Sequence, residues 1–571
     1  MDFQQQASAN QIKTPFHPFP NRFHINSNQV TQPLNIPNQK PLLNNNEIYM
    51  NFTTPKEIES FIKSKNNKKS FGYDNLPNYA LRKLNKQFFF FISVLFNQIF
   101  NSGYWPKSWK KAIIHPILKP GKNPQFLDSY RPISLLSCLS KIYETFIYQK
   151  IVNHCHDNKI LSNEQFGFRN NLSTNHALTT LMHNITTALM EKTPTICISL
   201  DNEKAFDTVW ISGLIYKLKY LFGFHKHLCQ IIYNYLKNRK FVVKVEDSES
   251  REFGIEAGAA QGSILAPILY ILYLSDFPTP TINNNNIIIK KILYADDIFI
   301  YTSTKNIHKA QKALNKYLQE IYEYLKTWKT NLNITKCESI VFYGDCKTVR
   351  RNIRQQIKRI KLHIQGTKIE IKKQLKYLGI TFTHNAKFYQ HIRNIISKVI
   401  KTFHTLKSII YKKNGLTPKI KMLIYKQLLR PILTYGFPVW FDISSAQMEK
   451  LRLIERKYLR VMCGLYRKPD SHKYHNNKKL YKTANIERID RFLIKNNIKF
   501  FEKIQNIENE IVLNCIQNSN NVNLEIPCKY NSPYYFPLIL RNKLLYNTNN
   551  ELIYYHRRLR GDRLVYNVNQ I

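Results

Sequence analysis

The feature that most constrains this chain is a pair of aspartates at the join between two apolar runs. Residues Ile287 to Leu293 and Ile298 to Thr302 are rich in β-branched and aromatic side chains, and Tyr294-Ala295-Asp296-Asp297 stands between them. Apolar runs separated by a short polar segment predict a β-hairpin, here with two carboxylates at its tip. Buried strands rarely tolerate unpaired charge at their join without a functional reason, so an ordinary polar turn is the less favoured interpretation.

A third aspartate follows another predicted strand. The apolar run Ile196 to Leu200 ends at Asp201, and further strands are predicted at Phe241 to Val245 and Ser339 to Phe342. A carboxylate at a strand end beside a two-carboxylate hairpin can hold hard divalent cations, because magnesium prefers oxygen ligands. Two such ions about 3.5–4 Å apart can activate an attacking hydroxyl and stabilise a leaving pyrophosphate.

Helical patterns alternate with these strands and dominate after about residue 385. Thr54-Pro55 predicts a helix N-terminus. Apolar residues from Phe388 to Ile410 recur at steps of three and four, which places them on one face of a single helix. Gly415 ends that helix, and Thr417-Pro418 begins the next. The length of 571 residues fits about three or four domains or subdomains.

The charge of the chain is strongly unbalanced. Lys and Arg number 85 against 38 Asp and Glu, which gives a formal net charge of +47. The usual partner of so positive a surface is a polyphosphate chain. A Lys- and Asn-rich composition that reflects biased coding is the competing explanation, so charge alone does not establish nucleic-acid binding.

Cysteine usage and hydropathy exclude several classes of protein. The nine cysteines contain no CxxC pair, so neither a disulfide framework nor a four-ligand zinc site is expected. His154-Cys155-His156 has metal-ligating side chains, but adjacent residues rarely converge on one ion, which favours a structural or surface role. The longest apolar runs, Phe88 to Phe96 and Ile264 to Leu274, are shorter than the roughly 20 residues that span a bilayer. We therefore expect a soluble, intracellular protein with no membrane partner.

The segment Tyr294-Ala295-Asp296-Asp297 matches the tyrosine-x-Asp-Asp box of reverse transcriptases. The surrounding blocks resemble those of non-long-terminal-repeat (LINE-type) retrotransposons, above all the Jockey-like elements, and are collinear across roughly residues 65 to 465. Besides the Asp-Asp box the blocks are Lys69-Ser70-Phe71-Gly72-Tyr73-Asp74, Ile117-Leu118-Lys119-Pro120-Gly121-Lys122 with Tyr130-Arg131-Pro132-Ile133-Ser134-Leu135, Gln165-Phe166-Gly167-Phe168-Arg169, Leu200-Asp201 with Ala205-Phe206-Asp207, Gln261-Gly262-Ser263, Asn333-Ile334-Thr335-Lys336 and Tyr377-Leu378-Gly379. Each block alone is weak, but their common order leaves little room for chance.

This resemblance implies an α+β right-hand polymerase with fingers, palm and thumb and an antiparallel palm sheet. Residues 1–55 would form a disordered Asn/Gln/Pro-rich leader, and 56–383 the fingers and palm, with the core motifs at about 100–383. Residues 384–470 would form a helical thumb. A basic, helical and Asn-rich extension would occupy residues 471–571.

The resemblance also implies roles for the acidic residues. Asp201 and Asp296 would be the metal ligands of two Mg²⁺ ions, with Mn²⁺ as an alternative, and Asp297 would support them. Lys336 would act either as a general acid toward the leaving pyrophosphate or as a phosphate contact, and both roles remain open.

Other residues would contact the nucleotide. Lys119 and Arg131 would grip the triphosphate, since an ammonium and a guanidinium fork both suit phosphate oxygens, with ordinary surface charge as the alternative. Phe206 would lie beneath the incoming sugar and exclude a 2′-hydroxyl, with a core Phe as the competing interpretation. Gln261 would contact the nucleotide, and Ser263 would be the N-cap of the apolar helix that follows.

Tyr377-Leu378-Gly379 would be the primer-grip hairpin, with Gly379 at its turn.

The chain departs from the family at two positions: Ala260 stands where Pro is frequent, and Cys337 stands where Thr is usual. Neither change removes a metal ligand. Family members also carry an endonuclease before the polymerase. Since about 60 residues precede the first block, we expect the polymerase part of a second open reading frame without its nuclease.

The sequence thus predicts an RNA-directed DNA polymerase that adds deoxynucleoside triphosphates to a DNA primer or target DNA on an RNA template. It would act in retrotransposition, in the nucleus and in cytoplasmic ribonucleoprotein, and its oligomeric state stays open. The alternative is a decayed or domesticated copy that binds RNA without polymerising, against which the three intact aspartates argue. A splicing-type intron maturase shares the palm, but the stretch Tyr435-Gly436 to Trp440 favours the LINE class.

Overall fold

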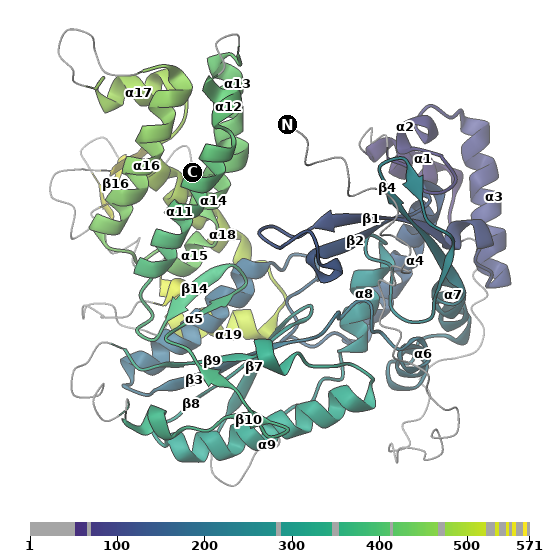
Figure 1. The fold of residues 1–571 in the computed structure, drawn as a ribbon, viewed down its shortest axis with the longest axis horizontal. Coiled ribbons are helices and arrows are strands. Elements are labelled where there is room, and N and C mark those ends of the chain that lie inside the picture. The colour runs from purple at the N-terminus through teal and green to yellow at the C-terminus, as the bar shows by residue number, and fades with distance from the viewer. Residues whose placement is uncertain are drawn as a thin grey trace. The chain divides into compact units, whose positions relative to one another are not determined.

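The computed structural model divides the chain into two compact units, and each unit is assembled from segments distant in sequence (Figure 1). Unit 1 comprises Met1–Ser162, Asn202–Pro278 and Ile321–Leu332, and unit 2 comprises Asn163–Asp201, Thr279–Glu320 and Asn333–Ile571. The residues that the structure describes are 52–65, 70–280, 287–344, 353, 355–411, 415–465, 474–520, 532–535, 544–546, 551–554 and 564–567. Most of the predicted leader therefore lies outside the described residues.

Unit 1 combines a mixed five-stranded sheet with helices. In the order β2-β1-β4-β5, β1 pairs antiparallel with β2 and parallel with β4, while β5 and β6 both pair antiparallel with β4. The elements are α1 (Pro55–Ser64), α2 (Asn78–Leu81), α3 (Lys86–Ser102), β1 (Lys111–Leu118), β2 (Tyr130–Leu135), α4 (Cys138–Asp157), α6 (Ile211–Tyr216), α7 (Lys226–Leu236), β4 (Arg239–Val245), β5 (Ser248–Glu249), β6 (Phe253–Ile255) and α8 (Leu265–Tyr273). The strand predicted at Phe241 to Val245 is confirmed as part of β4.

Unit 2 is built on a second five-stranded sheet, in the order β12-β9-β3-β8-β7, whose pairings are antiparallel apart from the parallel pair β12–β9. Its elements up to residue 383 are α5 (Thr174–Met190), β3 (Thr195–Asp201), β7 (Ile289–Tyr294), β8 (Asp297–Ser303), β9 (Glu338–Phe342), β10 (His363–Ile364), β11 (Thr367–Lys368), β12 (Glu370–Ile371), β13 (Gln374–Tyr377) and β14 (Ile380–Thr383). Helix α9 (Ile307–Thr327) begins in unit 2 and ends in unit 1. The predicted strands and the Asp-Asp hairpin are confirmed.

Helices follow in unit 2, and one hydrophobic core joins them to its sheet. Buried side chains from α5, the sheet, the β13–β14 hairpin and the later helices pack together, for example Leu181, Phe299, Tyr377, Tyr425 and Leu459. The later elements are α11 (Tyr389–Thr405), α12 (Lys407–Tyr411), α13 (Pro418–Ile424), α14 (Arg430–Thr434), α15 (Phe437–Trp440), α16 (Ser445–Cys463), α17 (Asn477–Ala484), α18 (Ile489–Ile504), α19 (Glu510–Asn520), β15 (Leu544–Tyr546), β16 (Glu551–Tyr554) and β17 (Leu564–Asn567).

Two predicted helix starts are confirmed by their capping interactions. Thr54 caps α1: its hydroxyl accepts from the Glu57 N–H, and the Glu57 carboxylate accepts from the Thr54 N–H. Thr417 caps α13 through one such bond, in which its hydroxyl accepts from the Ile420 N–H, and Pro418 is the first helical residue. In each case Pro fixes φ at a position where its missing N–H has no helical partner to lose.

Three details of the predicted helices are wrong. The helix predicted from Phe388 to Ile410 is divided into α11 and α12 at Leu406, whose N–H is shared between the carbonyls of Thr402 and Phe403. The apolar periodicity continues through this distortion and therefore does not reveal it. Ile264 rather than Ser263 holds the N-cap position of α8, although the Ser263 hydroxyl still accepts from the Ala266 N–H at 2.9 Å.

The third detail concerns the C-terminal extension, which was predicted to be helical. Helices α17, α18 and α19 agree with that prediction, but β15, β16 and β17 form an antiparallel sheet in the order β15-β16-β17. The strand segments are short runs of Leu, Ile, Val and Tyr, separated by the Asn-rich residues 547–550 and the Arg-rich residues 555–563. Three or four apolar residues are too few for a helical period and favour strands.

The cysteines and the longest helices are the features that bear on what the sequence makes unexpected. Every cysteine there is a free thiol, and no helix there is long and apolar enough to cross a membrane. The His154 ring packs 4.2 Å from the ring of Phe224, and its Nε2 lies 2.9 Å from the carbonyl oxygen of Phe222. The structural role predicted for the His-Cys-His segment is therefore confirmed for His154.

A buried ion pair holds unit 1 together beside α8. The Lys217 side chain is fully buried, pairs with Asp276, donates to the Tyr324 hydroxyl at 2.9 Å and lies 3.8 Å from the ring centroid of Trp328. Burial lowers the pKa of Lys217 to about 8, and the charge of Asp276 opposes that shift. The Lys217 ammonium, directly after α6, thus connects this part of the chain to the C-terminal ends of α8 and α9.

We predict that Lys217→Met destabilises the protein by about 3 kcal/mol, because removing one partner of a buried pair leaves the other uncompensated. The urea midpoint, followed by tryptophan fluorescence, should fall. Lys219→Met, which changes an exposed lysine on the same turn, is the control and should leave the midpoint within error. Equal midpoints for the two variants would contradict this role of Lys217.

Candidate active site

The β7–β8 hairpin places Asp296 and Asp297 next to the end of β3. Tyr294 pairs with Asp297, which leaves Ala295 and Asp296 as a two-residue turn, and Asp297 also pairs with Asp201, the last residue of β3. Ala295 adopts a φ of 56°, and two-residue hairpin turns use such left-handed conformations. The three predicted carboxylates therefore lie at one end of the unit 2 sheet.

Burial and mutual repulsion disfavour the ionised form of these acids. Burial, followed by the charges of Asp296 and Asp201, raises the pKa of Asp297 to about 6. Burial is also the main cause that raises the pKa of Asp296, and the charge of Asp201 adds to it, while a backbone hydrogen bond opposes the shift. A cation placed among the three side chains would relieve both effects.

Lys336 lies beside this cluster, as predicted. Its ammonium is 3.4 Å from Asp201 Oδ2 and two-thirds exposed, at 67%. The short 3₁₀ turn that carries it (Ile334–Lys336) is tied to β3, because the Asn333 N–H donates to the Asp201 carbonyl at 2.8 Å and the Lys336 N–H donates to the Asn333 carbonyl at 3.0 Å. Only the long side chain of Lys336 is thus free to swing.

Gln165 braces the carboxylate hairpin, a role that sequence reasoning missed. Its side chain is 3% exposed, and its Oε1 accepts from the N–H groups of Ala295 at 3.0 Å and of Gly167 at 2.8 Å. A Cβ on Gly167 would come within 2.3 Å of the Ala295 nitrogen, so only glycine permits this approach. The block Gln165 to Arg169 was the available signal in the sequence. It showed the order of the motifs along the chain, but it did not show that Gln165 contacts Ala295.

The predicted primer-grip hairpin has a second overlooked partner, Tyr435. Leu378 and Gly379 form the two-residue turn between β13 and β14, with φ values of 42° and 81°. The Tyr435 hydroxyl donates to the Leu378 carbonyl at 2.8 Å, and a Cβ on Gly379 would lie 2.9 Å from the Tyr435 ring. Tyr377 is buried in the unit 2 core. Tyr435 therefore fixes the tip of this hairpin.

The predicted nucleotide contacts lie together in unit 1. Lys119 and Arg131 are carried by the β1–β2 hairpin, where the Lys119 ammonium donates to the Asp128 carbonyl at 2.8 Å and Arg131 is exposed opposite Ile117. Lys204, which was not predicted, lies 3.8 Å from the Asp128 carboxylate. A group of cations thus gathers at this hairpin.

Phe206 and Gln261 belong to the same part of unit 1. Both are half-buried. The Phe206 ring lies 4.8 Å from that of Tyr270, and the Gln261 amide nitrogen donates to Asp207 Oδ1 at 3.0 Å. The structure thus forms two groups of predicted site residues, one in each unit.

The donor set of unit 2 fits a hard cation, although it is not a complete metal centre. Among the described residues no three His, Cys, Asp or Glu side chains converge closely enough to hold an ion by themselves. Magnesium commonly binds one or two carboxylates and completes its shell with waters and substrate phosphates. The carboxylates of Asp201 and Asp296, with Asp297 beside them, suit that mode of binding.

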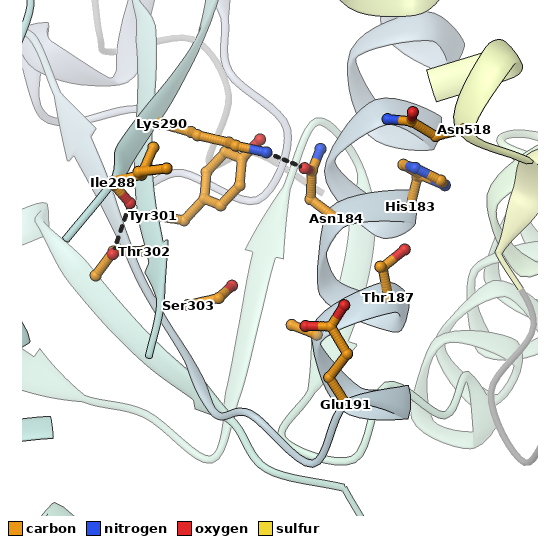
Figure 2. A pocket seen from close by; sticks show the side chains of 11 residues that line it. His183, Asn184, Thr187, Glu191, Ile288, Lys290, Tyr301, Thr302, Ser303 and Asn518 are labelled. Carbon is orange, nitrogen blue, oxygen red and sulfur yellow. Dashed lines mark hydrogen bonds between the residues drawn. The ribbon is translucent and has the colours of Figure 1, made fainter. Parts of the chain in front are cut away.

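A separate pocket of about 400 Å³ lies at the other end of β8 (Figure 2). It is lined by residues from α5, β7, β8 and α19, and the Lys290 ammonium donates to Asn184 Oδ1 there at 2.6 Å. Ser303 lines this pocket, whereas Asp297 begins the same strand. The pocket is therefore distinct from the carboxylate site.

Comparison with known proteins identifies the class. Residues 117–382, which carry both groups of site residues except for Tyr435, match the reverse transcriptase (RNA-dependent DNA polymerase) family. This segment of the chain is thus similar to reverse transcriptase domains.

Similarity to individual proteins shows which kind of reverse transcriptase the chain resembles. The chain is 33% identical over 464 residues to the RNA-directed DNA polymerase from mobile element jockey of Drosophila melanogaster, which covers 80% of this chain and 48% of that protein. It is 29% identical to the probable RNA-directed DNA polymerase from transposon BS of the same species, over 79% of this chain and 48% of that protein. The chain is thus homologous to polymerases of Jockey-like non-LTR retrotransposons and spans about half the length of these relatives.

Similar solved structures include apo telomerase from Candida tropicalis. That structure is 11% identical, with a TM-score of 0.36 over 75% of this chain and 74% of the telomerase chain.

We predict that Asp297→Asn stabilises the metal-free protein at pH 7.5. The raised folded pKa means that ionised Asp297 costs stability above about pH 6, and that this cost disappears as the pH falls toward the unfolded value near 4. The gain in melting temperature over the parent, measured with EDTA, should therefore shrink between pH 7.5 and pH 5.

Addition of Mg²⁺ should raise the melting temperature of the parent at pH 7.5 and raise it less at pH 5 or in Asp297→Asn. Glu502→Gln, which changes an exposed acid of unit 2, should behave as the parent throughout. A melting temperature that is insensitive to Mg²⁺ at both pH values would argue against cation binding at the three aspartates.

Proposed function

We propose that this chain is an RNA-directed DNA polymerase that extends a DNA primer with deoxynucleoside triphosphates and serves retrotransposition. The observation that carries the proposal is the meeting of Asp201, Asp296 and Asp297 at one sheet end, inside a segment that matches the reverse transcriptase family. In this proposal the unit 2 sheet is the palm, the unit 1 sheet belongs to the fingers, and residues 384–470 are the thumb. The template would be RNA, bound in the nucleus or in cytoplasmic ribonucleoprotein.

The acidic residues would hold two Mg²⁺ ions, which supply Lewis acidity at the primer hydroxyl and at the leaving pyrophosphate when bound. Asp201 and Asp296 would be their ligands, and Asp297 would add negative charge beside them. Gln165 would keep the hairpin in place, because its side-chain oxygen accepts from the Ala295 N–H beside both carboxylates. Lys336 pairs with Asp201 in the absence of substrate and has the reach to donate a proton or a hydrogen bond to a phosphate oxygen.

The cations of the β1–β2 hairpin would bind the triphosphate. Lys119, directly after β1, presents an ammonium, Arg131 on β2 presents a guanidinium, and Lys204 adds a second ammonium near the Asp128 loop. Exposed cations on α11, among them Lys398 and Lys401, would contact the phosphates of the template–primer duplex. The net charge of +47 supports a polyanionic partner.

We predict that Asp201→Asn and Asp296→Asn abolish divalent-dependent extension of oligo(dT) on poly(rA). Each change keeps the shape of the side chain and removes a charge that would hold the ions. The loss should be several kcal/mol of transition-state stabilisation, or roughly a thousandfold in rate. Glu502→Gln should extend like the parent.

Normal extension by both variants would show that these carboxylates do not hold the catalytic ions. A parent that binds RNA but stays inert with Mg²⁺ and Mn²⁺ would instead favour the non-catalytic RNA-binding alternative.

We predict that Phe206→Ala raises the ratio of ribonucleotide to deoxynucleotide incorporation by about tenfold or more, the scale on which a pocket discriminates one small group. The readout is the two values of kcat/KM on one template. Phe253→Ala removes a similarly half-buried ring of unit 1, which packs on Phe241 at 5.4 Å, and controls for lost packing. The same ratio in both variants would assign Phe206 to the core.

A further inference from the structure

The turn Gln261-Gly262-Ser263 is held by two surrounding segments of unit 1. The Ser134 N–H donates to the Gln261 carbonyl at 2.9 Å, and a Cβ on Gly262 would come within 2.7 Å of the Ser134 carbonyl oxygen. On the other side, the buried carboxylate of Glu144 accepts from the Ile264 N–H at 2.8 Å. The backbone of the turn is therefore fixed before any ligand binds.

The side chain of Gln261 is fixed by Asp207. Asp207 is 8% exposed, and its two carboxylate oxygens lie 3.0 and 3.2 Å from Gln261 Nε2. Asp207 itself is held by the backbone, because its N–H donates to the Lys204 carbonyl at 2.8 Å. A Cβ on Gly258 would come within 2.8 Å of the Asp207 Cα, so the two segments are in tight contact.

The ionisation of Asp207 decides which end of the amide faces it. Burial raises the pKa of Asp207 to about 6, against the Gln261 hydrogen bond and the charges of Lys204 and Lys119, which lower it. At neutral pH the carboxylate is therefore mostly ionised and can only accept hydrogen bonds. The Gln261 amide must turn its nitrogen toward Asp207, which leaves its oxygen as the free acceptor.

We propose that Asp207 is a positioning residue that presents the Gln261 amide oxygen, and not its nitrogen, to the incoming nucleotide. This inference rests on the proposed polymerase function and on the contact between Gln261 and the nucleotide. Phosphate groups of an ionised triphosphate only accept hydrogen bonds, whereas sugar hydroxyls and base amines donate them. The presented oxygen therefore binds the nucleoside end of the substrate and disfavours a phosphate at the same place.

The test is an exchange of the two functional groups. Asp207→Asn removes the charge and allows the amides to pair in either orientation, so the KM for the nucleotide should rise about tenfold, the scale of one hydrogen bond, with kcat changed less than twofold. Gln261→Glu places two carboxylates in contact and should raise KM at least as much. The double variant Asp207→Asn/Gln261→Glu restores one charge, with the new amide donating to the new carboxylate, and should return KM to within about threefold of the parent.

Extension of oligo(dT) on poly(rA), with dTTP varied, gives kcat and KM for all four proteins. Asp247→Asn, which changes an exposed acid in the β4–β5 turn of unit 1, is the charge control and should match the parent, and circular dichroism checks the fold. If Asp207→Asn does not fold, the lower KM of the double variant relative to Gln261→Glu carries the test.

An inert parent would refute the proposed function itself. An active parent with an unchanged KM in Asp207→Asn would overturn the inference, and so would a double variant no better than Gln261→Glu.

Discussion

Burial of three carboxylates at one sheet end, together with the repulsion between their charges, is the constraint on which the rest of this structure depends. Two carboxylates at a hairpin tip and a third on the neighbouring strand are partly buried, and the fold keeps them there at a cost in free energy. Such an arrangement persists only where the surroundings hold it. Gln165 supplies that support through two backbone N–H groups, and the close approach of Gly167 completes it. A cation bound among these carboxylates would therefore offset both the cost of their burial and the repulsion between their charges.

Buried acids also occur in unit 1, where their carboxylates accept hydrogen bonds that fix backbone and side-chain groups. Glu144 is fully buried, and its carboxylate accepts from the Ser140 hydroxyl and the Ile264 N–H. Asp207 does the same for the Gln261 amide. An ionised carboxylate is a strong acceptor, and charge-assisted hydrogen bonds are about twice as strong as neutral ones. Glu144 and Asp207 thus each hold a neighbouring group in place in unit 1.

Much of this arrangement could be predicted from sequence, and the reasons for the remainder are physical. The Asp-Asp hairpin and the strand before Asp201 follow from short apolar runs that end at polar residues, which is a local property. The bracing contacts of Gln165, Tyr435 and Asp207 join residues far apart in the chain, for example 130 residues between Gln165 and Ala295. A single sequence carries no signal for such pairs. The break at Leu406 was hidden because the apolar period runs through it.

The interleaving of the two units has a consequence for how the chain folds as it leaves the ribosome. The chain passes from one unit to the other after Ser162, Asp201, Pro278, Glu320 and Leu332. Unit 1 lacks its last segment until residue 332 has been synthesised, and the central strand β3 gains its partner β9 only after that. Long-range pairings of this kind fold slowly and expose unpaired strand edges meanwhile. Strand β3 therefore stays without its β9 partner until residues 338–342 have been synthesised, and a premature stop before residue 332 yields no complete unit.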